Sequence, residues 1–380
     1  MKSTTRKHSF VMPAPTSPAR TEKGFSLIEL LVATAVFVLV TGSAFDLFMK
    51  QQKLESNQKG QAALNIGLRN ALTQLQIDLA NAGAGYFVGA NVPSWPVGVT
   101  IINNPAGSGC YSGNFVYSAS CFDVLNIIKA DPNTPPIHVD GNGTTCSSTT
   151  SSIAFGDPAT VYSGNPPVGT TLTAAQTAAY FHAGDQLLLI TSTGSQLSTI
   201  VLTADGGVAG GKVQLQHNPS GANGTNSPSN DPLGITTNAN NKLGTQFCKN
   251  DWILKLAPIT YDVDTSNPND PKLMRVQNAN AAEVMDQVIG FKVGAAIWNA
   301  PAGTVNAEYN YDASTYTNVN PGDEAYNFTL VRSLRISLIG RTPPSTDPAY
   351  NFHNLFDQGP YQIQGSAVVV NPRNLSMNDN

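Results

Sequence analysis

Hydrophobic and polar positions divide the chain into one long apolar segment near its start and many short apolar runs afterwards. Residues 25–45 form an apolar run in which Glu29 is the single charged residue. A helix over this run would be about 30 Å long at ~1.5 Å per residue, which matches the hydrocarbon core of a bilayer. We therefore predict that residues 25–48 span a membrane. A carboxylate in lipid is costly unless it is paired, so Glu29 needs a functional explanation.

The pattern then changes to that of an amphipathic helix over residues 49–82. Apolar residues recur there at spacings of three and four, which predicts one face that packs against a folded domain. These residues are Leu64, Leu68, Ala71, Leu72, Leu75, Leu79 and Ala82. No proline occurs between Phe25 and Val92, and Gly83 and Gly85 supply a stop signal.

Residues 83–380 contain short apolar runs separated by turn-forming segments, which is typical of antiparallel β-structure. The clearest strand candidates are residues 97–102, 123–129, 185–191, 199–202, 212–216, 253–263, 272–276, 288–298, 329–339 and 361–370. Residues 219–241 have almost no large apolar side chains and are expected to form a surface insertion. The predicted fold class is α+β: a long N-terminal helix packed on a large antiparallel β-rich head.

Composition and charge are consistent with an exported protein. The 380 residues include 33 glycines and 25 prolines, and only 12% are charged. Residues 1–24 hold five basic side chains and one acidic one, a net charge of +4. Because the whole chain has a net charge of −4, the remainder has a net charge of −8. A basic segment before an apolar run places the N-terminus in the cytoplasm. The acidic remainder argues against nucleic acid as a partner.

The four cysteines all follow the apolar run, on the side expected to be translocated. An even number in an exported region favours two disulfides, and four cysteines allow three pairings. The interpretation we favour joins Cys110 to Cys121 and Cys146 to Cys248. A zinc site is disfavoured because no CxxC or paired-histidine spacing is present.

Sequence motifs for catalysis or for a resident cofactor are absent. None of the five histidines lies in a metal-ligand spacing, and no nucleophile elbow or phosphate-binding loop occurs. We therefore expect neither an enzyme nor a cofactor. Asp262 and Asp264 have the start of a calcium-loop spacing, but Leu273 stands where the loop needs a glutamate. A strand end with an Asx turn is the alternative interpretation.

The start of the apolar run resembles a known processing signal. Residues 24–33, Gly-Phe-Ser-Leu-Ile-Glu-Leu-Leu-Val-Ala, resemble the class III signal and N-terminal methylation motif of the type IV pilin and pseudopilin superfamily. The resemblance implies that a prepilin peptidase cuts after Gly24 and that Phe25 is N-methylated. It also implies that Glu29 pairs with the terminal amine of a neighbouring subunit, which agrees with the need of a buried carboxylate for a cation. Residues 1–24 would then be a removed leader peptide.

Further stretches resemble minor pilins of the PilW type. They are residues 78–86 at the predicted helix end, residues 261–264 and 273–276, residues 283–288, and residues 331–342. The family resemblance covers both ends of the chain, whereas residues 100–250 match nothing. The head of nearly 300 residues is also large for such a protein.

The resemblance implies a minor pilin that helps to prime type IV pilus assembly near the pilus tip. Its partners would be the prepilin peptidase, other minor and major pilins, the inner-membrane assembly platform and the lipid bilayer. It would reside in the bacterial inner membrane with a periplasmic head, and later on the pilus at the cell surface. Two alternatives remain at this point: a pseudopilin of a type II secretion system, and a pilus-borne adhesin or binding module in the unmatched middle.

Overall fold

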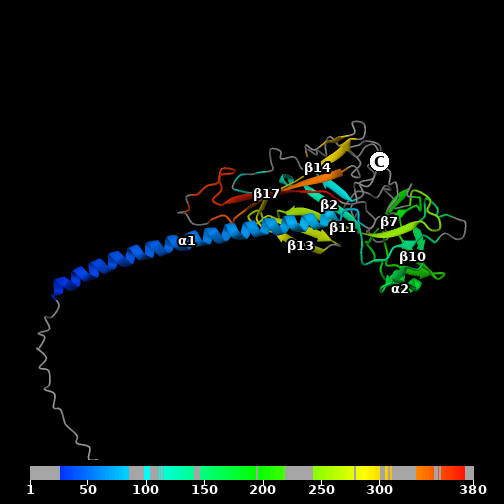
Figure 1. Ribbon diagram of the computed structural model, residues 1–380, viewed down its shortest axis with the longest axis horizontal. Coiled ribbons are helices and arrows are strands. Elements are labelled where there is room, and N and C mark those ends of the chain that lie inside the picture. Colours follow the sequence, from blue (N-terminus) through cyan, green and yellow to red (C-terminus); the bar gives the residue numbers. More distant parts are fainter. Residues whose placement is uncertain are drawn as a thin grey trace, which may run out of the picture. The chain divides into compact units, whose positions relative to one another are not determined.

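The computed structural model shows one long helix and a β-rich head (Figure 1). It describes residues 26–84, 98–102, 111, 113, 115–140, 146–193, 196–218, 243–277, 280–299, 304–306, 309, 331–345, 350 and 352–372. The chain forms two compact units, residues 1–59 and residues 60–380. All packing described below lies within the second unit.

Helix α1 extends from Leu27 to Ala80 and ends two residues before the expected position. The glycine stop signal works through backbone geometry, because Gly83 has a φ of 70°. Its amide donates to the Ile128 carbonyl at 2.8 Å, which fixes the direction in which the chain leaves the helix. Gly85 lies outside the described residues.

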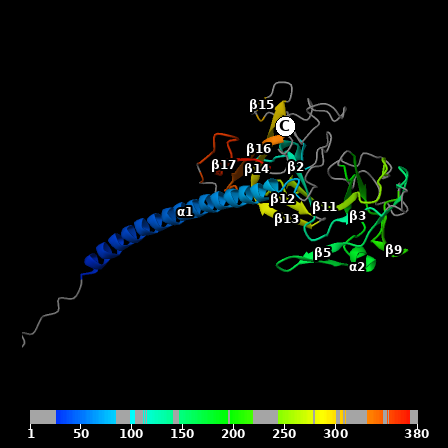
Figure 2. The same ribbon diagram turned by 45° about the vertical axis from the view of Figure 1, so that its right-hand side comes forward.

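The apolar face predicted for the second half of α1 is buried. Every residue of the stripe is less than 9% exposed: Leu64, Leu68, Ala71, Leu72, Leu75, Leu79 and Ala82. They belong to one hydrophobic cluster with the inward-facing residues of the head's larger sheets, including Ile127, Ile259 and Phe291. Figures 1 and 2 show this half of α1 beside β11 and β13.

The other elements are short except for three strands of 11 to 13 residues that follow residue 250. In chain order they are β1 (Val99–Ile102), the 3-10 helix η1 (Ala119–Cys121), β2 (Val124–Ala130), β3 (Ile137–His138), β4 (Ile153–Gly156), β5 (Thr160–Ser163), β6 (Val168–Thr171), α2 (Ala174–Ala178), β7 (Gln186–Ile190), β8 (Leu197–Val201), β9 (Gly207–Ala209), β10 (Lys212–Gln216), β11 (Trp252–Asp264), β12 (Lys272–Gln277), β13 (Asn280–Met285), β14 (Val288–Asn299), β15 (Thr304–Asn306), β16 (Val331–Arg341) and β17 (Ile363–Val370).

All described strand pairs are antiparallel, as the alternating pattern predicted. One sheet has the order β1-β2-β11-β12-β13, and β11 also pairs with β3 and β7. A second sheet has the order β15-β14-β16-β17. Smaller groups are β4-β10-β9 and the hairpin β5-β6. The α+β fold class expected from the sequence is confirmed.

The described residues of the head form two hydrophobic cores. The first joins α1 to the large sheets. The second is built by residues between Ile137 and Ile253, among them Phe181, Leu189, Leu215 and Phe247. Most of its elements, including β7, β10 and α2, are coloured green in Figure 1. The second core therefore comes from the middle of the chain, where the sequence showed no family resemblance.

Each strand candidate in the sequence overlaps a strand in the structure, and residues 212–216 have the observed bounds. The strands that the pattern missed are β3, β4, β5, β6, β9, β13 and β15. They are two to six residues long, and β5, β6 and β13 are mostly exposed. Without a buried face, a strand has little hydrophobic signal and depends on its pairing partner.

Candidate functional site

The start of α1 is built by a reciprocal pair of side-chain hydrogen bonds. The Ser26 hydroxyl accepts from the Ile28 amide at 3.3 Å, and the Glu29 carboxylate accepts from the Ser26 amide at 3.0 Å. The second bond is the one a capping box makes, and it satisfies an amide that the helix leaves unpaired. A carboxylate in the first turn also interacts favourably with the helix dipole. Gly24 and Phe25 lie outside the described residues.

The first half of α1 presents an uncovered apolar surface. Leu27, Phe37 and Leu39 are 80%, 69% and 71% exposed. The same is true, at more than half exposed, of Ile28, Leu30, Leu31, Val32, Val36, Val38, Val40, Phe45, Leu47, Phe48 and Met49. Within the described part of the chain, α1 is the one helix long and apolar enough to cross a membrane. Exposing an apolar surface of this size to water is unfavourable, so we expect lipid or other helices to cover it.

At its other end, α1 is tied to the head by a buried ionic cluster. The Asp78 carboxylate accepts from Arg275 Nε at 2.7 Å and from the Tyr261 hydroxyl at 2.6 Å. Arg275 makes a second bond to the same carboxylate at 3.3 Å. Asp78 is 3% exposed and Tyr261 is fully buried. The helix end, β11 and β12 therefore meet in one place.

The charges in this cluster stabilise each other. Burial raises the pKa of Asp78, but the hydrogen bonds from Arg275 and Tyr261 outweigh it, so its pKa lies below the usual range. The hydrogen bond to Asp78 raises the pKa of Arg275. Burial, followed by the bond to Asp78, raises the pKa of Tyr261. Asp78 is about 50 residues beyond the start of a helix that rises ~1.5 Å per residue, so it lies outside the bilayer span.

A second buried cation lies at the end of β16. Arg341 is 1% exposed and donates from Nε to the Gln287 side chain at 2.8 Å. It also donates to the backbone carbonyls of Phe115 and Asn269, at 2.9 and 3.0 Å. Its guanidinium lies 4.9 Å from the centre of the Tyr361 ring. Arg341 thus joins the end of β16 to three neighbouring loops, which is a structural role.

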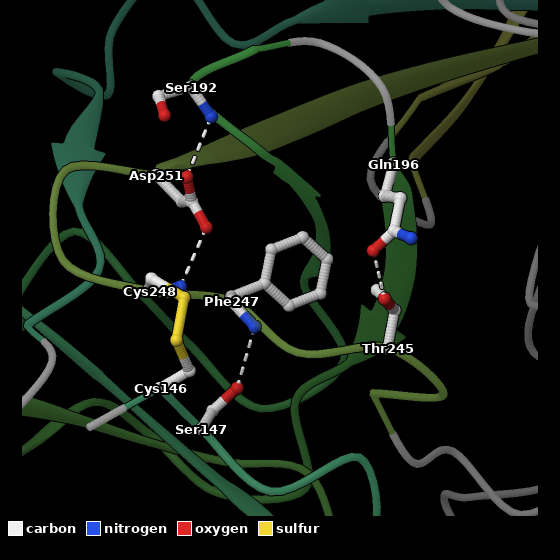
Figure 3. The surroundings of a disulfide bond; sticks show 8 residues. All are labelled: Cys146, Ser147, Ser192, Gln196, Thr245, Phe247, Cys248 and Asp251. Atoms are coloured by element: carbon white, nitrogen blue, oxygen red, sulfur yellow. Dashed lines mark hydrogen bonds between the residues drawn. A yellow bond between two sulfur atoms is a disulfide. The ribbon is translucent and has the colours of Figure 1, made fainter. Parts of the chain in front are cut away.

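The disulfide between Cys146 and Cys248 lies next to Phe247, a residue of the second core (Figure 3). Beside it, the Phe247 amide donates to the Ser147 hydroxyl at 2.9 Å. Asp251 accepts from the Cys248 and Ser192 amides, both at 2.6 Å. The pairing is the one favoured by the sequence, and the carboxylate of Asp251 fixes the turn that carries one of the two sulfur atoms.

Of the other favoured pair of cysteines, the structure describes only Cys121. Cys121 ends the 3-10 helix η1, is 5% exposed and is disulfide-bonded. Cys110 lies outside the described residues.

The two aspartates considered for calcium lie at the end of β11. The Asp264 carboxylate accepts from the Ser266 amide at 2.8 Å, which is an Asx turn. Burial, followed by repulsion from Asp264, raises the pKa of Asp262. Among the described residues, no group of three or more His, Cys, Asp or Glu side chains is arranged to hold a metal ion. The Asx turn at Asp264 is the feature expected of a strand end.

Sequence reasoning singled out Glu29 but missed what the structure does with Asp78 and Arg341. Nothing in the local sequence marks Arg341 as a buried charge, whereas Asp78 does have a local signal. An aspartate among the buried leucines of an amphipathic face was the available signal for Asp78, because a charge on that face needs a partner.

Comparison with known proteins agrees with the geometry of the helix start. Residues 19–45 match the family described as the prokaryotic N-terminal methylation motif. No curated protein and no solved structure matches the chain. The match covers the expected cleavage position, the capped helix start and the uncovered apolar run, and it implies processing by a prepilin peptidase and association with pilins. The chain therefore carries the membrane-anchoring class III signal of type IV pilin-like proteins.

Proposed function

We propose that this protein is a minor pilin that joins a type IV pilus through the first half of α1 and helps to prime its assembly. Its role is structural rather than catalytic. The head would fold in the periplasm while the N-terminus faces the cytoplasm, as the basic leader favours. The inner-membrane assembly platform and other pilins would then take up the subunit, which would reach the cell surface near the pilus tip.

The observation that carries the proposal is the position of Glu29. It is the single charged residue between Ser26 and Phe45, on a helix surface that is otherwise uncharged, mostly apolar and uncovered. Cleavage after Gly24 would create a charged amine at Phe25, one helical turn away. In a bundle of such helices, the Glu29 carboxylate of one subunit is a suitable partner for the terminal amine of the next.

Processing is the first part of the test. The full chain is expressed with and without an active prepilin peptidase, and its intact mass and N-terminal sequence are measured. We expect loss of residues 1–24 and a methylated Phe25 only when the peptidase is present. An uncleaved chain in the presence of a peptidase matched to it would contradict the proposal.

Assembly is the second part, and the capping box makes its design specific. Glutamine at position 29 keeps an acceptor for the Ser26 amide but has no charge, whereas valine removes both. We expect Glu29→Gln and Glu29→Val to insert and be cleaved, but to enter sheared pili at least tenfold less than wild type. Glu55→Gln is the control, since Glu55 is an exposed helix carboxylate paired with Lys59.

Two results would contradict charge pairing. Incorporation of both position-29 variants at the wild-type level would exclude any assembly role for Glu29. Normal incorporation of Glu29→Gln with failure of Glu29→Val would assign the effect to the helix cap instead of the charge.

A further inference from the structure

The middle of the chain is inserted into a β-hairpin of the first core. Strand β2 ends at Ala130, which is paired directly with Leu256 of β11. The next backbone pair is closed by the Asp131 amide, which donates to the Lys255 carbonyl at 2.8 Å. The 123 residues between Asp131 and Lys255 therefore connect the two strands of a single hairpin. We call residues 132–254 the inserted module.

The module is closed where it begins and ends. Strand β3 pairs with the first residues of β11, so that His138 is opposite Trp252. The Val139 amide donates to the Asp251 carbonyl at 2.7 Å. The disulfide Cys146–Cys248 follows, with a sequence separation of 102 residues. The second hydrophobic core lies within these limits, so the module has its own core and its own covalent closure.

A cavity of about 440 Å³ lies in this module. Its size is within the range of ~300–1,000 Å³ that is usual for small-molecule sites. The described lining comes from several of the module's segments and includes Asp140, Ile153, Leu189, Lys212, Leu243 and Phe247. No described lining residue belongs to the first core.

The chemistry of the lining selects a class of ligand. Most of the wall is apolar, and Asp140 and Lys212 form an ion pair in it, with side chains 9% and 31% exposed. Because the two charges compensate each other, an ionic ligand would have to displace one partner and leave the other unpaired in a partly buried site. A neutral ligand with adjacent hydroxyl groups has no such cost. One hydroxyl donates to the carboxylate, the next accepts from the ammonium, and the C–H face packs on the apolar wall.

We propose that the inserted module is a binding module whose cavity takes a neutral saccharide unit, with Asp140 and Lys212 as its polar contacts. The module would present this site on the surface of the filament into which α1 packs. Binding to purified protein does not depend on processing or assembly, so its failure would leave the proposed role in pilus assembly untouched.

The test uses the detergent-solubilised full chain on an array of neutral and acidic glycans, followed by calorimetric titration with the best neutral glycan. We expect binding to neutral glycans and little binding to acidic ones. Lys212→Met and Asp140→Asn should each raise the dissociation constant at least tenfold. Ala209→Leu fills the cavity from its wall without removing a polar group, and it should also abolish binding.

Lys272→Met is the matched control, because Lys272 is an ion-paired lysine of β12, outside the module. It should bind as wild type does. Near-UV circular dichroism and the thermal midpoint show that each variant is folded. The proposal is overturned if folded wild type binds no glycan or only acidic glycans. It is also overturned if Ala209→Leu remains folded and binds as tightly as wild type.

Discussion

Asp78 offers a direct measurement of how firmly the long helix is held to the head. Asp78→Ala removes the partner of a mostly buried guanidinium and of the fully buried Tyr261 hydroxyl. Breaking a buried ion pair costs about 3–5 kcal/mol, and an unsatisfied buried hydroxyl costs about 1–3 kcal/mol. The side chain of Arg275 is 20% exposed and recovers part of its hydration. We therefore expect a loss of about 3 kcal/mol in the free energy of unfolding.

The assay is urea unfolding of the detergent-solubilised full chain, followed by tryptophan fluorescence and circular dichroism. Asp78→Asn keeps an acceptor for Tyr261 but loses the charge, so it should cost about 1.5–3 kcal/mol. The double variant Asp78→Leu with Arg275→Met leaves no unpaired charge and should be less destabilised than the two single losses together. Lys272→Met on the same strand breaks a solvent-screened pair with Glu283 and should change the stability far less than Asp78→Ala does.

The pH dependence follows from the direction of the shift. The pKa of Asp78 is lower in the folded chain than its unfolded value of 3.8. Its contribution is therefore fully present above that unfolded value and is lost as the pH falls through the lower folded pKa. Wild type should lose more stability on acidification below pH 4 than Asp78→Asn. A cost below about 1 kcal/mol for Asp78→Ala, or equal acid sensitivity of the two proteins, would refute the reasoning.

Three further predictions concern the head. Replacing residues 132–254 by Asn-Gly should leave a first core that still unfolds cooperatively, because Asp131 and Lys255 are already in hairpin register; a chain without a cooperative transition in urea would contradict the insertion. Cys248→Ser opens a loop of about 100 residues, so it should destabilise the inserted module by up to about 4–5 kcal/mol and make it the first site of limited proteolysis; cleavage first in residues 256–277 would contradict this. Asp262 has a raised pKa in the folded chain, so its contribution to stability is lost as the pH rises. Asp262→Asn should therefore raise the free energy of unfolding at pH 7 by about 0.5–1 kcal/mol and have little effect near pH 3. An equal change at both pH values would contradict this.

The sequence by itself determined the elements whose signal is local. The apolar run, the amphipathic stripe from Leu64 to Ala82 and the glycine stop at Gly83 all follow from residue spacing and backbone preference. The same holds for the long strands, which have a buried face and therefore a visible alternation. Glu29 was conspicuous because a carboxylate in an apolar run is costly unless it has a partner.

Tertiary structure alone decided which distant residues meet. Asp78 and Arg275 are 197 positions apart, and the residues that hold Arg341 come from three other parts of the chain. The division into two cores depends on Ala130 and Leu256 being paired across the inserted module. Hydrophobic periodicity reports which side of an element is buried, but the pairing partner of that side is a property of the whole fold.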